Sequence, residues 1–276
     1  AGLPTSGVDV RPEVLQRFEA EGGRGVTTPA EAAAQSDVIF LFVVNAEQTE
    51  QVLFGPNGAV ATARPGTVFI LGVTMPPSAS IVLCERLVAA GMAPIDAPVS
   101  GGSAKALAGA MTIMAAGDPA AFERAGPAFE AIASKVYRLG DTPGMGSQVK
   151  MVNQLLAGVH IAATAEAMTL GAKVGIDLAQ LYEVICDCAG SSWMFKNRGA
   201  HIVAGDYTPH SAVDIFVKDL GIVASEAGEA GCSTPLTAAA LALFQEASAA
   251  GLGREDDAAV AKILAAKAGV DLPGGG

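Results

Sequence analysis

Apolar residues in the first half of the chain occur in short continuous runs separated by Gly, Pro and polar residues. The runs at 37–45 (DVIFLFVVN) and 67–74 (TVFILGVT) are β-branched and aromatic, and further strands are predicted at 93–99 and 111–117. Runs of this kind are typical of strands buried on both faces of a parallel sheet. Helical segments alternate with them, so the sequence predicts a doubly wound α/β domain over residues 1–142.

Helical periodicity replaces the strand pattern after residue 142. Residues 144–175 contain no proline and are rich in Ala, Leu and Met, which predicts one long, mostly buried helix. We expect this helix to be too polar to cross a membrane. The rest of the chain to about residue 268 has the pattern of helices with short breaks, so an all-α domain is predicted over residues 143–276.

The first turns of the long predicted helix carry Lys150, followed on the same face by Asn153, Gln154 and Ala157. The helix macrodipole disfavours a positive charge near a helix start, and an apolar wall removes its hydration. Both effects favour a neutral amine, which can act as a base near neutral pH. The alternative is a solvated lysine on an amphipathic helix.

Composition narrows the possible classes of protein. Hydrophobic residues make up 51% of the chain, charged residues 16%, and the formal net charge is -11. Such acidity argues against binding to nucleic acid or to an anionic membrane. The four cysteines and three histidines show no ligand spacing, so neither a metal site nor a disulfide framework is expected, and reduced thiols suit a cytoplasmic protein.

A Ser-Gly-Gly turn follows the strand predicted at 93–99, in the segment DAPVSGG at 96–102. Ligands of open α/β sheets bind outside the carboxyl ends of the strands. Ser100, Gly101 and Gly102 could direct a hydroxyl and backbone N–H groups toward a carboxylate. The alternative is an ordinary turn, because Gly and Ser are common turn residues.

Other strand ends carry candidates for cofactor binding. Val43, Val44 and Asn45 end one predicted strand and Thr74 ends the next, where a nicotinamide ribose or ring could lie, although Asn and Thr also serve as caps. Asp9 ends the first predicted strand. A carboxylate there accepts from an adenosine ribose 2'-OH and repels a 2'-phosphate, which favours NAD; the alternative is a cap for the helix starting at Pro12.

Several motifs in order give the chain a close resemblance to the β-hydroxyacid dehydrogenases, a family that includes 3-hydroxyisobutyrate dehydrogenase. They are DAPVSGG at 96–102, the spacing Gly144-x-Gly146-x-x-x-Lys150-x-x-Asn153, and Lys218 within FVKDL at 216–220. Blocks such as AGSSWMF at 189–195 look most like the branch that oxidises L-threonate at C2 with NAD. The roles of Trp193 and Phe195 stay open.

The resemblance implies a Rossmann-like domain, an all-α domain built on one long helix, and a task for each residue. Ser100, Gly101 and Gly102 would hold the substrate carboxylate, and Lys150 would take the hydroxyl proton as hydride leaves for NAD. Asn153 would bind the same end of a small carboxylate-bearing substrate. Lys218 would contact the cofactor, oriented by Asp219, and a homodimer or homotetramer is expected.

Departures from the family pattern refine the expectation. Relatives often have Asn four residues after the lysine, where this chain has Gln154, so its role is left open. The 6-phosphogluconate dehydrogenases carry a glutamate where this chain has Ala157, which favours a simple dehydrogenase. Alternatives are 3-hydroxyisobutyrate or tartronate semialdehyde chemistry, and a catalytically dead helical dimerisation protein, although that would be expected to have lost Lys150.

The family begins with a strand and a G-x-G-x-x-G loop that binds the pyrophosphate, and Ala1-Gly2 already resembles the end of the helix that follows them. We therefore expect the biological protein to carry that strand and loop, and the chain as printed to bind NAD weakly.

Overall fold

A computed structural model describes residues 2–274 of the chain. The chain forms two compact units, Ala1–Lys150 and Met151–Gly276, which divide inside helix α7 (Met145–Lys173). The predicted boundary at residues 142 and 143 lies just before this helix begins. Each unit is described separately.

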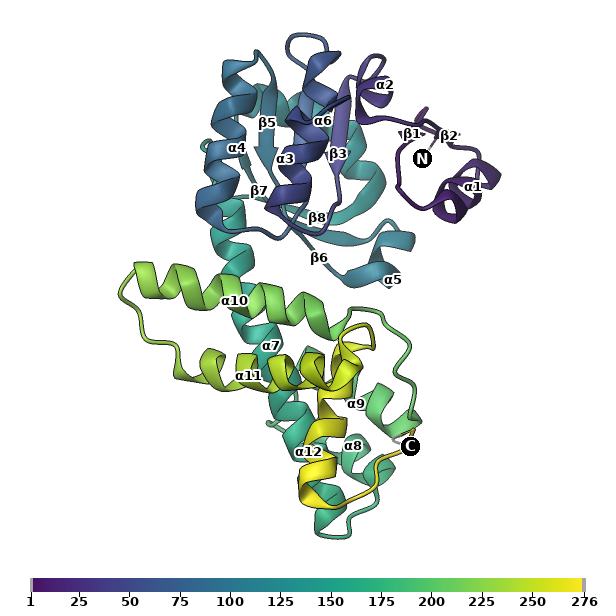
Figure 1. Ribbon diagram of the computed structural model, residues 1–276, viewed down its shortest axis with the longest axis vertical. Helices are drawn as coiled ribbons and strands as arrows, with labels where there is room; N and C mark the ends of the chain where they lie inside the picture. The colour runs from purple at the N-terminus through teal and green to yellow at the C-terminus, as the bar shows by residue number, and fades with distance from the viewer. Residues whose placement is uncertain (1, 275–276) are drawn as a thin grey trace. The chain divides into compact units, whose positions relative to one another are not determined.

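The first unit contains a small and a large sheet (Figure 1). In the small sheet, β1 (Ser6–Gly7) pairs in parallel with β2 (Arg24–Gly25), and α1 (Pro12–Ala20) connects them. The strand order of the large sheet is β3-β4-β5-β7-β6, and β8 pairs with β7. Its strands are β3 (Val38–Leu41), β4 (Val68–Leu71), β5 (Ala93–Asp96), β6 (Val99–Ser100), β7 (Met111–Gly117) and β8 (Ala133–Arg138).

The strand β4 shows why this sheet is covered on both faces. All four of its residues are fully buried, and alternate side chains of a strand point to opposite faces. Phe69 and Leu71 belong to one apolar cluster, whereas Val68 and Ile70 belong to another. The strands β3, β4 and β5 are parallel, while β7 is antiparallel to β5, so the sheet is mixed. The predicted doubly wound, Rossmann-like architecture is confirmed.

Helices cover the two faces of the large sheet. Leu53 of α3 (Ala46–Phe54) and Leu87 of α4 (Pro77–Ala89) join the cluster of Phe69, and Phe122 of α6 (Pro119–Ile132) joins the cluster of Ile70. The remaining helices of this unit are α2 (Pro29–Ala33), α5 (Gly102–Leu107) and the short 3-10 helix η1 (Ala59–Ala61).

The prediction that the 37–45 run is buried on both faces was wrong. In β3 only Leu41 is fully buried, and beyond its end Phe42 is 56% and Val44 48% exposed. The strand β3 is an edge strand of the large sheet among residues 2–274, so it lacks the second neighbouring strand that β4 has. Phe40 and Phe42 stack on each other with ring centroids 4.3 Å apart.

The second unit is helical, as predicted. After α7 come α8 (Leu178–Asp187), α9 (Trp193–Ala204), α10 (Val213–Glu229), α11 (Pro235–Ala247), the π-helical segment η2 (Ser248–Leu252), the 3-10 helix η3 (Asp257–Ala259) and α12 (Val260–Ala268). One apolar cluster joins them, including Ile161 and Met168 of α7, Phe216 and Leu220 of α10, and Phe244 of α11.

Helix α7 corrects one expectation. By length and composition it could cross a membrane, with a mean hydropathy of 1.3 in its most apolar window, so the statement that it is too polar was wrong. A core helix of a soluble protein meets the same criterion. Ile161, Ala165 and Met168 are buried against α10 and its neighbours, which explains their apolar character by packing within the helical unit.

Candidate active site

Two neighbouring parallel strands end beside the predicted cofactor residues. Val43, Val44 and Asn45 follow β3, and Thr74 follows β4. Asn45 caps α3 by accepting the backbone N–H of Gln48 at 2.8 Å, and the Val44 N–H donates to Gln48 Oε1 at 2.9 Å. The alternative role of Asn45 as a helix cap is therefore confirmed. Exposed apolar surface at Val44, beside this ordered turn, fits a nicotinamide nucleoside at the strand ends.

Asp9 lies two residues after β1 and binds Arg11. Its carboxylate accepts the Arg11 backbone N–H at 2.9 Å and the Arg11 Nε–H at 3.1 Å. These hydrogen bonds lower the pKa of Asp9 below its usual value of 3.8. The N-cap residue of α1 is Arg11, and no side-chain hydrogen bond caps this helix, so Asp9 does not cap it directly. An ionised carboxylate at a strand end fits a ribose diol.

The Ser-Gly-Gly turn joins β6 to α5. Ser100 pairs with Thr112 of β7, and the next two residues have positive φ angles, +136° at Gly101 and +65° at Gly102. Side chains rarely adopt such angles, and a Cβ at Gly101 would also lie 2.6 Å from the side chain of Lys105. The turn therefore requires glycine, and it leaves Ser100 half-buried beside two backbone N–H groups.

A buried carboxylate connects β5 to the start of α7. Asp96 is 1% exposed and accepts four hydrogen bonds: from Ser80 Oγ at 2.9 Å, from the Gly144 N–H at 2.9 Å, and from the N–H and Oγ of Ser147 at 2.9 and 2.6 Å. Asp96 lies within the DAPVSGG motif, but no role was predicted for it from the sequence. The signal available was a carboxylate inside an otherwise apolar strand.

Close approach explains the second glycine of the Gly144-x-Gly146 motif. A Cβ at Gly146 would lie 2.5 Å from the carbonyl oxygen of Met114 and 2.6 Å from that of Asp96. Gly144 has a φ of +107°, which also favours glycine. The motif thus lets the first turn of α7 lie directly against the strands β5 and β7.

Lys150 lies in the second turn of α7 and is only 7% exposed. The alternative of a solvated lysine is therefore wrong. Asn153 follows one turn later on the same helix and is half-buried, and Ala157 belongs to the apolar core of the helical unit. No acidic group occupies the Ala157 position.

Four polar residues of the helical unit form a chain of hydrogen bonds between α7 and α10. Asn153 Nδ2 donates to Gln154 Oε1 at 2.9 Å, and Gln154 Nε2 donates to Asp219 Oδ2 at 2.5 Å. Lys218 Nζ donates to Asp219 Oδ1 at 2.6 Å. Asp219 is 2% exposed, so this pair is not a solvated pair on a helix surface. The predicted residues Asn153 and Lys218 are thus linked through two residues.

The two aromatic residues with open roles differ in environment. Phe195 is 4% exposed and stacks on Tyr182 with centroids 5.9 Å apart, so it belongs to the core. Trp193 is 56% exposed at the start of α9, where Ser192 caps the helix.

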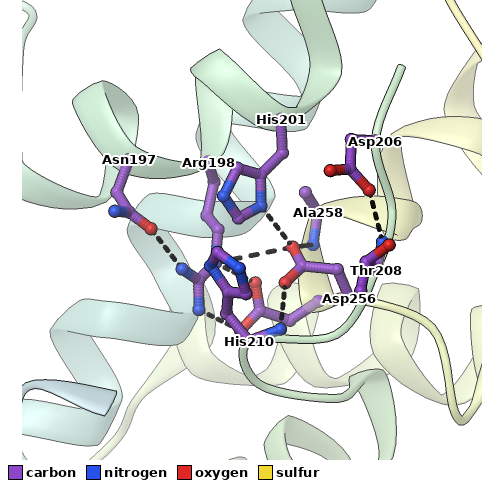
Figure 2. A network of polar contacts seen from close by, with 9 residues as sticks. Asn197, Arg198, His201, Asp206, Thr208, His210, Asp256 and Ala258 are labelled. Atoms are coloured by element: carbon purple, nitrogen blue, oxygen red, sulfur yellow. Dashed lines mark hydrogen bonds and ion pairs between the residues drawn. The ribbon is translucent and has the colours of Figure 1, made fainter. Parts of the chain in front are cut away.

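A second buried polar cluster was missed by the sequence analysis (Figure 2). Arg198 Nη2 donates to Asp257 Oδ2 at 2.8 Å, and Arg198 Nε also donates to Asp257. Asp256 accepts the N–H groups of His210 and Ala258, and its Oδ1 lies 3.0 Å from His201 Nδ1. Burial and the neighbouring Asp256 raise the pKa of Asp257 to about 6, against the opposing effect of Arg198. The cluster fastens α9 to η3.

Two family models match the chain. One describes the NAD binding domain of 6-phosphogluconate dehydrogenase and matches residues 1–140. The other describes the NAD-binding of NADP-dependent 3-hydroxyisobutyrate dehydrogenase and matches residues 144–264.

Individual relatives extend the likeness to nearly the whole chain. The L-threonate dehydrogenase of Cupriavidus necator is 53% identical over 274 residues, which covers 99% of this chain and 91% of that protein. The L-threonate dehydrogenase of Escherichia coli strain K12 is 49% identical, with coverages of 99% and 90%. The crystal structure of a 3-hydroxyisobutyrate dehydrogenase from Salmonella typhimurium has a TM-score of 0.90 at 49% identity, and the match covers 95% of this chain and 92% of that one.

A Rossmann-like sheet is followed by a helical unit, and NAD-binding models match residues 1–140 and 144–264. These findings define an NAD-dependent oxidoreductase. The chain belongs to the β-hydroxyacid dehydrogenase family. The resemblance carried by the motifs is confirmed, and with it an NAD-dependent hydroxyacid dehydrogenase activity.

Proposed function

We propose that this protein oxidises L-threonate, or a closely similar hydroxy acid, at C2 to the 2-oxo acid. The observation that supports this substrate is the identity of 53% and 49%, over 99% of the chain, to two proteins named L-threonate dehydrogenase. Burial of Lys150 on α7, one turn before Asn153, supports the chemistry, because a desolvated lysine can act as a base near neutral pH.

In the proposed mechanism, Ser100, Gly101 and Gly102 bind the substrate carboxylate through a hydroxyl and backbone N–H groups. Neutral Lys150 accepts the proton of the C2 hydroxyl at its Nζ, and Asn153 contacts the same substrate. The products are the 2-oxo acid and protonated Lys150, which returns its proton to water. The protein therefore supplies orientation and one proton acceptor.

We assign the cofactor to the strand ends. Val43, Val44, Asn45 and Thr74 would line the nicotinamide nucleoside, Asp9 would accept from the adenosine ribose, and Lys218 would contact the cofactor near its reactive ring. Bound NAD supplies the acceptor for the hydride that leaves C2. Asp219 holds Lys218 by the 2.6 Å ion pair and so limits where its ammonium group can lie.

Two other substrates are the alternatives, 3-hydroxyisobutyrate and tartronate semialdehyde. One pocket methyl or hydroxyl group changes preference by only about 1 to 3 kcal/mol, so small changes of side chain separate these activities. The test is a comparison of kcat/KM for L-threonate, 3-hydroxyisobutyrate and glycerate with NAD, following NADH formation. A higher value for 3-hydroxyisobutyrate would reject the L-threonate assignment, and no turnover with any acid would favour a helical dimerisation protein without catalysis.

We further propose that residues 1–142 form the dinucleotide-binding domain and residues 143–276 the substrate and dimerisation domain of a cytoplasmic homodimer or homotetramer. The four apolar residues Met145, Val149, Val152 and Leu156 support association, because each is at least 37% exposed and all recur along α7. Light scattering on the purified protein measures the number of subunits, and a monomer would reject this assembly.

A further inference from the structure

The hydrogen bonds between α7 and α10 have only one possible direction. A lysine ammonium group has only N–H donors, and a carboxylate paired with it has only acceptors. Asp219 therefore accepts from Lys218 at one oxygen and must accept at the other. Gln154, the partner at that second oxygen, has to present its Nε2 donor to Asp219.

The donor and acceptor of the next hydrogen bond, between Gln154 and Asn153, are fixed in the same way. With Nε2 committed to Asp219, Gln154 turns its carbonyl Oε1 toward Asn153. Asn153 Nδ2 donates to this oxygen at 2.9 Å. The hydrogen bond orients the Asn153 amide and leaves Oδ1 as its available acceptor. The amide of a half-buried asparagine is thus oriented by a lysine on another helix.

Packing holds this chain of contacts in place. Gly158 lies one turn after Gln154, and a Cβ there would lie 2.7 Å from the side chain of Leu220, next to Asp219. The missing side chain leaves room for Leu220 of α10 against α7. Gln154 is 7% exposed and Asp219 2%, so water does not compete for the internal hydrogen bonds.

We propose that Gln154 and Asp219 are positioning residues that fix Asn153 Oδ1 as an acceptor for a second hydroxyl of the substrate. This inference rests on the proposed function. The reacting hydroxyl has a single hydrogen, which goes to Lys150, and the product carbonyl has no donor. An acceptor at Asn153 therefore suits a different hydroxyl, and the substrate class is a polyhydroxylated acid rather than an acid with one hydroxyl.

The substitution Asp219→Asn tests the direction of the relay. Lys218 would donate to the new amide oxygen, so the new amide nitrogen would face Gln154 and reverse it. Gln154 would then donate to Asn153 Oδ1, and Asn153 would offer its N–H groups to the substrate in place of an acceptor.

The measurement is the ratio of kcat/KM for L-threonate to kcat/KM for 2-hydroxybutanoate of the same configuration at C2. Any effect of the substitution on NAD binding cancels in this ratio. We expect the wild-type protein to prefer L-threonate and Asp219→Asn to lower the ratio by about tenfold, the scale of one lost hydrogen bond to a buried group.

Two further variants complete the test. Gln154→Met keeps the Asp219–Lys218 ion pair but removes both amide contacts, so the ratio should fall in the same direction. Asp214→Asn is the matched control, because Asp214 lies on α10 and accepts Ser248 Oγ at 2.6 Å, apart from the relay. It should leave the ratio unchanged.

Unchanged ratios in both Asp219→Asn and Gln154→Met would overturn the proposal, as would a wild-type protein without preference between the two acids. If Asp219→Asn does not fold, the ratio measured for Gln154→Met alone decides: a lower ratio supports the proposal, and an unchanged ratio overturns it. A wild-type protein that oxidises neither acid would reject the proposed function itself and the substrate assignment that rests on it.

Discussion

Asp96 accepts both the backbone N–H and the hydroxyl of Ser147, at 2.9 and 2.6 Å, across 51 positions of sequence. The same carboxylate accepts the Gly144 N–H at 2.9 Å. Two N–H groups at the start of α7 thus have their acceptor on β5, and the first turn of the helix that carries Lys150 is fixed to the large sheet.

Asp96→Ala should destabilise the protein strongly, whereas Asp96→Asn should be milder. Each buried N–H left without an acceptor costs about 1 to 3 kcal/mol, so losing Gly144 and Ser147 as partners costs about 2 to 6 kcal/mol. The asparagine oxygen can still accept both N–H groups, and its amide nitrogen can donate to the hydroxyls of Ser80 and Ser147. Denaturant unfolding measures the difference.

The matched control is Asp118→Ala, which removes an exposed helix cap on Ala120 and should cost about 1 kcal/mol. Equal losses for the Asp96→Ala and Asp96→Asn variants would contradict the hydrogen-bonding account of Asp96 and point to its charge instead.

Replacing Lys150 should abolish most turnover without unfolding the protein. Lys150→Ala is expected to lower kcat by at least about 100-fold, the scale of losing a general base. Lys150→Met, which keeps the side-chain volume, should give the same loss. Steady-state kinetics and circular dichroism measure the two properties. Lys173→Ala, at the far end of α7, is the control, and a Lys150 variant with more than about a tenth of wild-type turnover would remove this residue from the mechanism.

The ion pair between Asp9 and Arg11 predicts how cofactor preference can be changed. The wild-type protein should use NAD in preference to NADP, because the Asp9 carboxylate repels a 2'-phosphate. Asp9→Asn removes that charge and releases the Arg11 guanidinium, so the ratio of kcat/KM for NAD over NADP should fall by about tenfold or more. Asp37→Asn, which breaks the exposed pair of Asp37 with Arg64, is the control. Equal kcat/KM values for both cofactors in the wild-type protein would refute this role of Asp9.

The buried cluster around Arg198 predicts a loss of stability that depends on pH. The pKa of Asp257, about 6 in the folded protein, lies above its usual 3.8, so the folded state binds more protons than the unfolded state between these values. The contribution of Asp257 to stability therefore falls as pH rises through this window and is constant above it. Arg198→Met removes the charge that lowers the pKa of Asp257, so this pKa should rise further. The loss of stability with rising pH should then continue to higher pH.

We expect Arg198→Met to lower the free energy of unfolding by about 3 to 5 kcal/mol near pH 8 and by much less near pH 5. His201, His210 and Asp256 face the same cluster, so the comparison is made with the wild-type protein at both pH values. Arg64→Met, from an exposed ion pair, should cost at most about 1 kcal/mol. An equal loss for Arg198→Met at both pH values would contradict the prediction.

Elements with strong local patterns were predictable from sequence. The strands β4 and β7 and the helix α7 were predicted from local composition and from the Gly and Pro residues that bound them. The exposure of Phe42 was not predictable, since an apolar run has the same sequence pattern in a central strand and in an edge strand.

The motifs gave the candidate residues, whereas their polar partners could not be read from the sequence. Gln154 meets Asp219 across 65 positions, and Arg198 meets Asp257 across 59. Such pairs leave no periodic signal, because each depends on how two helices or a strand and a helix pack. Lys150 was chosen by its motif, but its burial became known only from the fold.

The close contact of Gly158 with Leu220 has a consequence for protein engineering. Gly158 carries no functional group, yet an added methyl group there would lie 2.7 Å from the side chain of Leu220, which would have to shift beside Asp219. A library that varies only the residues around the substrate would never sample this position. Redesign of substrate preference therefore has to treat the spacing of two helices as part of the specificity, and Gly158 as a position to hold constant.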